Sequence, residues 1–200
     1  MSRFLGPIHY WLYNKIRLQN QLAERMVDFA EENNIALREA LDKRYGVLPE
    51  EELESIIDTG NIHGWLQQKV STVEYRLAYA VTEILNQKPE LKSDLEDIAF
   101  SFGEEIAPKT GSTALEMYKL LNDSLLDGMP CDHANSVVAQ EENKVTWRRN
   151  KCLHEDYWQQ VGGNIEVYYS LRDQLIKGLL QGSNLQYVNN GDSTYSIMTK

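Results

Sequence analysis

The chain has 200 residues, of which 42% are hydrophobic, and this suits one large or two small domains with a buried core. Its formal net charge of −10 argues against binding to nucleic acid or to an anionic membrane surface. No apolar run approaches the roughly 18 residues of a membrane helix, and no signal peptide opens the chain, so we expect a cytoplasmic protein.

The first 127 residues predict a series of helices. Apolar side chains with a helical period run from Ile8 to Phe29, after a Gly6-Pro7 start that is favourable because proline at the first helical position loses no hydrogen bond. Further helices are expected over 35–44, from Pro49 up to a break at 58–61, and over 62–85, 93–102 and 112–126. The N-terminal half is therefore expected to be mostly helical.

The pattern changes after Pro130. Two β-rich runs at 136–139 and 144–148 predict a hairpin, and helical patterns follow at 153–161 and 164–180. A second hairpin is expected at 185–188 and 194–198, around the turn Asn189-Asn190-Gly191-Asp192. The predicted fold class is α+β, with a helical domain at 1–128 and a small β-β-α-α-β-β module at 129–200.

One pattern, G-x-I-H-x-W-L-x-x-K-[IV], begins at Gly6 and again at Gly60. It predicts an internal duplication with helical units at 6–58 and 60–126. Two copies of one unit usually pack about a pseudo-two-fold axis, an arrangement that would bring His9 and His63 together.

The repeated residues are candidates for ligand binding. Each histidine falls in the opening turn of a helix, where unpaired backbone amides favour the neutral ring that binds metal or accepts a proton. The tryptophans would supply apolar walls, and the lysines would pair with a carboxylate or an anionic ligand. The candidate cofactor-binding residues are Trp11, Lys15, Trp65 and Lys69. Helix packing alone would preserve the same residues, so this structural interpretation stays open.

The remaining histidines belong to two Cys-x-His segments, at 131–133 and 152–154. Thiolates and imidazoles are preferred ligands of zinc and also suit iron. On an extended strand, residues two apart share one face, and the intervening hairpin would bring the two segments close. The candidate metal ligands are His9, His63, Cys131, His133, Cys152 and His154. Zinc or iron is the expected metal, in one composite site or in two separate sites.

Other interpretations compete for the same atoms. The two cysteines would form a redox-responsive disulfide, or Cys152 would act as a nucleophile with His154 as its base and a small molecule as the ligand. The eleven tyrosines and four tryptophans would line a pocket for a flat cofactor such as haem, although core packing also explains them. A third hypothesis is a homodimer whose interface is the repeated Trp/His helices.

A family resemblance covers about the last 70 residues. It lies in the run Trp-Arg-Arg-Asn-Lys-Cys-Leu-His-Glu-Asp-Tyr-Trp from Trp147, followed by Tyr168, Arg172 and Gly178 before a final hairpin. This part resembles the C-terminal module of L-2-amino-thiazoline-4-carboxylic acid hydrolase-like proteins of anaerobic bacteria. The resemblance implies an α+β module with a cysteine near a ligand site, and Cys152 is the residue that it places there. The helical half has no counterpart in that family.

Overall fold

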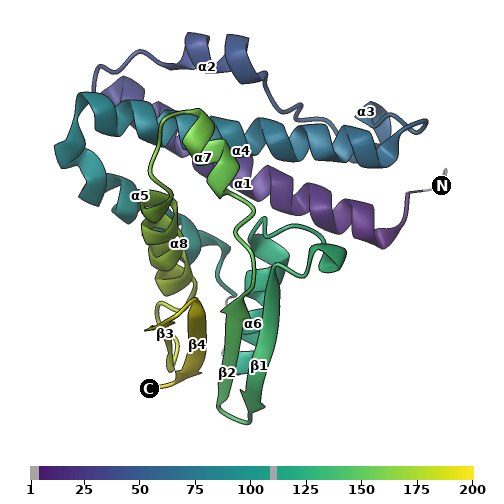
Figure 1. Cartoon of the computed structure of the whole chain (residues 1–200), viewed down its shortest axis with the longest axis vertical. Helices are drawn as coiled ribbons and strands as arrows, with labels where there is room; N and C mark the ends of the chain where they lie inside the picture. The colour runs from purple at the N-terminus through teal and green to yellow at the C-terminus, as the bar shows by residue number, and fades with distance from the viewer. Residues whose placement is uncertain (1–4, 109–111) are drawn as a thin grey trace. The chain divides into compact units, whose positions relative to one another are not determined.

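The computed structural model describes residues 5–108 and 112–200. It is an α+β structure with a helical N-terminal half and a four-stranded antiparallel sheet near the C-terminus, which confirms the predicted α+β class and the helical N-terminal half (Figure 1). The first elements are α1 (Pro7–Glu32), α2 (Arg38–Tyr45), α3 (Leu53–Ile56), α4 (Ile62–Gln87), a 3₁₀ turn η1 (Pro89–Leu91), α5 (Lys92–Ile106) and α6 (Ala114–Ser124). They are followed by η2 (Pro130–Asp132), β1 (Asn135–Glu141), β2 (Lys144–Arg149), α7 (Glu155–Gln160), α8 (Ile165–Leu179), β3 (Leu185–Gly191) and β4 (Thr194–Thr199).

The chain forms two compact units, and neither is a single stretch of sequence. Unit 1 holds the described part of 1–91 together with 124–126 and 156–164, and unit 2 holds the described parts of 92–123, 127–155 and 165–200. Helices α5 and α6 thus belong to the same unit as the sheet. The units do not follow the predicted boundary at residue 128, because α5 packs against α8 rather than with the preceding helices.

Helices α1 and α4 run parallel in unit 1. Contacting residues keep a nearly constant sequence separation, 54 for His9 and His63 near one end and 52 for Glu24 and Arg76 further along. An antiparallel pair would give a separation that changes along the helices. The shared direction is visible in Figure 1, where the purple α1 and the blue-green α4 both start near the same end. The duplication itself stays a prediction, but the two sequence repeats lie side by side in register.

The segment that joins these parallel helices has to return along their length. A helix of 26 residues is roughly 39 Å long, because each residue adds about 1.5 Å. Extended chain covers such a distance with fewer residues than helix does. The helix expected from Pro49 accordingly begins later, at Leu53, and Glu52 is its N-cap with extended backbone angles. The expectation for Pro49 through Glu52 was therefore wrong.

A buried arginine connects three helices of unit 1. The Arg76 side chain, on α4, is only 1% exposed. It donates to Glu24 of α1 at 2.6 Å, to Asp42 of α2 at 2.7 Å and to the Gly46 carbonyl at 2.5 Å. These bonds offset the cost of removing the charge from water, and they hold α2 against the helix pair.

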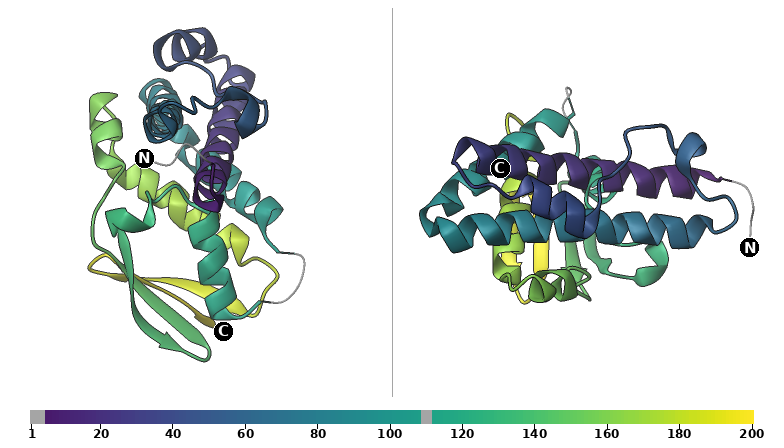
Figure 2. Two further views of the ribbon diagram at one scale, coloured as in Figure 1. Left: turned by 90° about the vertical axis from the view of Figure 1, so that its right-hand side faces the viewer. Right: turned by 90° about the horizontal axis from the view of Figure 1, so that it is seen from above.

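The sheet of unit 2 has the strand order β1-β2-β4-β3. Because successive side chains alternate between faces, Val145, Trp147 and Arg149 of β2 share one face. Trp147 is opposite Tyr195 of β4 and contacts Tyr118 of α6, so the helices of unit 2 cover this face (Figure 2). The side chain of Arg148 points to the other face and is exposed.

Helices α5 and α8 approach each other closely through two glycines. A Cβ atom at Gly103 would collide with the Leu175 carbonyl, and one at Gly178 would collide with the Phe100 carbonyl. The two backbones are thus in direct contact at this crossing, which only residues without side chains permit.

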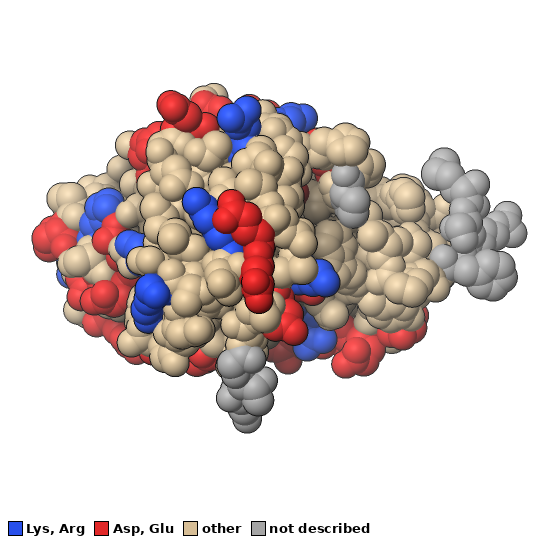
Figure 3. All heavy atoms as spheres, turned by 90° about the horizontal axis from the view of Figure 1, so that it is seen from below, with Lys and Arg blue, Asp and Glu red and all other residues tan. Residues whose placement is uncertain are grey.

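In the described part of the chain, no helix combines the length and apolarity needed to cross a bilayer. The face drawn in Figure 3 carries acidic and basic side chains interspersed among uncharged ones.

Candidate functional site

The histidines of the two repeats meet at the start of α1 and α4. Their Nε2 atoms are 3.4 Å apart, and their ring centroids are 5.5 Å apart. His9 is buried, whereas His63 is exposed. The parallel packing of the repeats explains this pairing, because it places equivalent positions of the two helices side by side.

The hydrogen bonds of His9 define its tautomer. The Gly6 backbone amide donates to His9 Nδ1 at 2.8 Å, which caps α1. A neutral ring that accepts at Nδ1 carries its proton on Nε2, so His9 donates from Nε2 to the unprotonated Nε2 of His63. Metal binding at His9 Nε2 requires the Gly6 bond to break first, because that nitrogen must then lose its proton.

The tryptophans and lysines of the repeats pair with each other. Lys15 Nζ lies 3.9 Å from the centroid of the Trp11 ring, and Lys69 Nζ lies 5.1 Å from that of Trp65. Both pairs are four positions apart on their helices, so the two copies share one local structure. Their predicted role in cofactor binding stays a prediction.

The two Cys-x-His segments lie next to each other in unit 2. Asn150 donates from its side chain to the His133 carbonyl at 3.0 Å. A Cβ atom at Gly128 would touch both Asp132 and Leu153, the central residues of the two segments. The expected extended geometry is wrong, however. Cys131 lies in a 3₁₀ turn, and His133 has a left-handed φ of 49°, so alternation between two faces does not apply.

Among residues 5–108 and 112–200, no group of three or more His, Cys, Asp or Glu side chains is arranged to hold a metal ion. Cys131 and His133 are exposed, and both cysteines are free thiols. Cys152 lies in the loop before α7 rather than in its first turn, since α7 begins at Glu155. The unpaired backbone amides of the first turn of α7 therefore lie beyond Cys152 in the chain.

Two consecutive tyrosines of α8 hold the second Cys-x-His segment. Tyr169 donates its hydroxyl hydrogen to Cys152 Sγ at 3.0 Å, and the Tyr168 hydroxyl lies 2.9 Å from His154 Nε2. Burial and the bond to Cys152 raise the pKa of Tyr169, so its hydroxyl keeps the proton that it donates. The Arg149 guanidinium lies 3.7 Å from the centroid of the Tyr169 ring.

His154 joins a buried ion pair. The Asp127 carboxylate accepts two bonds from Arg172, at 2.5 and 2.6 Å, and lies 3.3 Å from His154 Nε2. Burial raises the pKa of Asp127, but the charge of Arg172 and the bonds from His154 and Arg172 outweigh it and hold that pKa well below its usual range. An ionised carboxylate only accepts, so His154 Nε2 carries a proton. A protonated Nε2 cannot accept the proton of Cys152, which is the role that the sequence predicted for His154.

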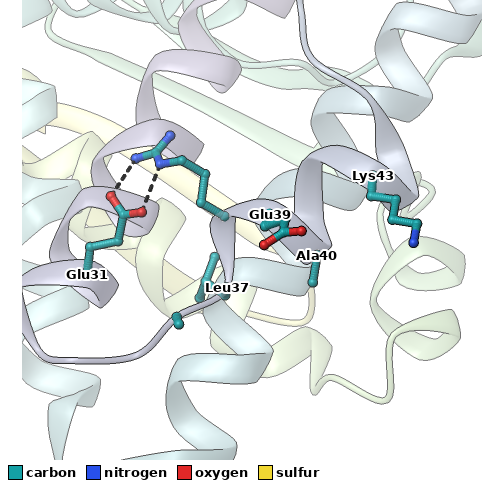
Figure 4. Close-up of a pocket in the computed structure, with 7 residues that line it drawn as sticks. Glu31, Leu37, Glu39, Ala40 and Lys43 are labelled. Carbon is teal, nitrogen blue, oxygen red and sulfur yellow. Dashed lines mark hydrogen bonds and ion pairs between the residues drawn. The ribbon is translucent and has the colours of Figure 1, made fainter.

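A surface hollow of about 470 Å³ lies beside α2. Figure 4 shows Glu31, Glu39 and Lys43 around it. The Glu31 carboxylate accepts two hydrogen bonds from Arg38, one from Nε and one from NH2. Arg38 also binds Glu24 and Asp28, so its charge is already paired with carboxylates. We assign no site to this hollow.

Sequence reasoning missed Asp127 and Arg149. A signal for the ion pair was present, because Arg172 interrupts the apolar stripe of α8, and a charge on a buried face needs a partner. The sequence did not identify that partner, which lies 45 residues earlier.

Comparisons of this chain with known protein families, with curated proteins and with solved structures found no match.

Proposed function

We propose that the protein is a thiol-dependent hydrolase of a small amide or cyclic substrate, with Cys152 as the nucleophile. The supporting observation is the hydrogen bond from Tyr169 to Cys152 Sγ. Sulfur is a weak hydrogen-bond acceptor, and a hydroxyl donor aimed at it fixes the position of the Cys152 side chain. Arg149, stacked on the same ring, adds positive charge nearby.

The proposed chemistry is acyl transfer. The Cys152 thiolate adds to the carbonyl carbon, and the C–N bond breaks as the leaving nitrogen takes a proton from water. Hydroxide or water then hydrolyses the thioester, releasing the acid and restoring the thiol. His154 would position the loop through Asp127 and Tyr168 rather than remove the proton from Cys152 through Nε2.

Alkylation with iodoacetamide at neutral pH tests this proposal, with each cysteine followed by peptide mass spectrometry. We expect Cys152 to react faster than Cys131, although Cys131 is the more exposed thiol. Tyr169→Phe should slow Cys152 several-fold and leave Cys131 unchanged. Tyr157→Phe is the matched control, because the hydroxyl of Tyr157 bonds to Ser71 instead. A Cys152 that reacts no faster than Cys131 would contradict the proposal.

A second candidate function is metal binding at the paired histidines. It is favoured by the 3.4 Å between the two Nε2 atoms, since two nitrogens about 2.0–2.1 Å from a tetrahedral zinc are about 3.3–3.4 Å apart. Zinc titration followed by calorimetry tests it. One site should disappear in His9→Ala and in His63→Ala but persist in His133→Ala, and equal binding by all three variants would reject this candidate.

A further inference from the structure

Arg149 occupies the last position of β2, on the face of the sheet that the helices cover. Its NH1 group donates to the Tyr195 hydroxyl at 2.6 Å, and its NH2 group lies 3.5 Å from Ser193 Oγ. The guanidinium plane thus has neutral partners on the sheet and an aromatic ring on α8. A guanidinium has five N–H donors, so these two contacts do not use its full capacity.

The charge of Arg149 has no carboxylate partner among residues 5–108 and 112–200. Arg38, Arg76 and Arg172 each bind at least one carboxylate. Burial, with a contribution from the charge of Asp173, raises the pKa of the neighbouring Tyr195. Asp173 itself forms its hydrogen bonds with Tyr187 and Asn189. The chain has ten more acidic than basic residues, and yet this half-buried arginine has no carboxylate partner among the described residues. An anion would bind more strongly to such a guanidinium than to one that is fully exposed to water.

We infer that Arg149 binds the carboxylate of a small substrate whose electrophilic carbon faces Cys152. This inference rests on the proposed function and names its substrate class. Tyr169 contacts both groups, with its hydroxyl on Cys152 Sγ and its ring under the guanidinium. A carboxylate on Arg149 would therefore hold the rest of a small molecule beside the thiol, which raises its effective concentration there.

Two alkylating reagents of nearly the same size separate this role from simple stacking. Iodoacetate carries a carboxylate and iodoacetamide carries a neutral amide. With either, the thiolate displaces iodide and forms a thioether. The quantity measured is the rate ratio of iodoacetate to iodoacetamide at Cys152, divided by the same ratio at the exposed Cys131. This quotient cancels the intrinsic reactivities of the reagents and of each thiol.

In the unmodified protein we expect a quotient of about ten, the effect of one charge-assisted hydrogen bond. It should fall to about one in Arg149→Gln and take an intermediate value in Arg149→Lys, which keeps the charge without the planar fork. Arg148→Gln is the matched control, because it removes the neighbouring arginine from the opposite, exposed face. Thermal unfolding of each variant establishes that it is folded.

A quotient near one in the unmodified protein, or one that Arg149→Gln leaves unchanged, would overturn this inference. A second readout does not depend on the reagents: propionate should protect Cys152 from iodoacetamide, propionamide should not, and Arg149→Gln should abolish the protection. Failure of the proposed function looks different, because Cys152 would then be slower than Cys131 with iodoacetamide while its preference for iodoacetate remained.

Discussion

At the scale of single residues, the buried ion pair of Asp127 and Arg172 is the clearest contribution to stability. The side chain of Arg172 is 8% exposed and that of Asp127 12% exposed, and their two bonds have bidentate geometry. Removing one partner leaves the other charge buried without compensation. The stability of unit 2 should therefore depend on both side chains together.

Asp127→Asn should destabilise the protein by about 3–5 kcal/mol, the usual cost of an unpaired buried charge. Urea unfolding measures this change. Arg172→Met should cost much less in the Asp127→Asn background than alone, because the two residues act as one unit. Asp192→Asn makes the same chemical change in an exposed turn and should shift stability by less than about 0.5 kcal/mol. Equal costs for the two Asp→Asn variants would contradict this assignment.

The same carboxylate predicts how stability depends on pH. The folded pKa of Asp127 is held below its unfolded value, which is about 3.9. Its contribution is therefore complete above the unfolded value and is lost as the pH falls through the folded value. The difference in unfolding free energy between the wild type and Asp127→Asn should narrow as the pH falls from about 4 toward 2. A difference that stays constant over this range would show that another group is responsible.

Rarity in the sequence identified some of the site residues and not others. Cys152 and His154 were found because the chain has only two cysteines and four histidines. Arg149 is one of many charged residues, and nothing in its sequence context shows that it lacks an acidic partner. That property depends on which side chains surround it in three dimensions. The tautomer of His9 likewise follows from one backbone bond that only the fold defines.

Elements were predicted well where a local signal determines them. Helix α1 follows a Gly-Pro start and an apolar period, and it lies close to the expected residues. The final hairpin also lies close to the expected strands, but its turn is at Asp192 and Ser193, because Asn190 and Gly191 still belong to β3. Helix α3 is shorter than expected because the requirement to cross back along α1 and α4 is not local. The crossing of α5 and α8 is also non-local, since it depends on glycines that are 75 positions apart, at 103 and 178.

The close contact of α5 and α8 predicts that one added methyl group destabilises the protein. Gly178→Ala places a Cβ atom against the Phe100 carbonyl, and backbone cannot move aside as a flexible side chain would. We expect a loss of about 1–3 kcal/mol, the range for overpacked contacts, although alanine has the better helix propensity. Lys177→Ala on the exposed side of the same helix should be nearly neutral. Thermal unfolding distinguishes the two, and a stabilised Gly178→Ala variant would mean that α5 and α8 are further apart.

At the scale of the whole molecule, the sequence suggested a boundary where the composition changes. The hairpins after Pro130 differ in pattern from the helices before it, so residue 128 looked like the end of a domain. The compact units are instead defined by contacts between elements. Helix α5 belongs with α8 and the sheet although it precedes the predicted boundary. A change of composition along the chain does not show which helix covers which surface.

The fragment 129–200 should therefore not fold by itself. It lacks α5, so the face of α8 that includes Gly178 loses its partner, and it lacks α6, so Trp147 loses the contact with Tyr118. Exposure of these apolar surfaces removes a large share of the driving force for folding a short chain. We expect poorly dispersed amide resonances and no cooperative thermal transition. The fragment 92–200 restores both helices and is the matched control. If 129–200 gave a dispersed spectrum and a sharp transition of its own, the contact-based division of the chain would be wrong and the boundary at residue 128 would be correct.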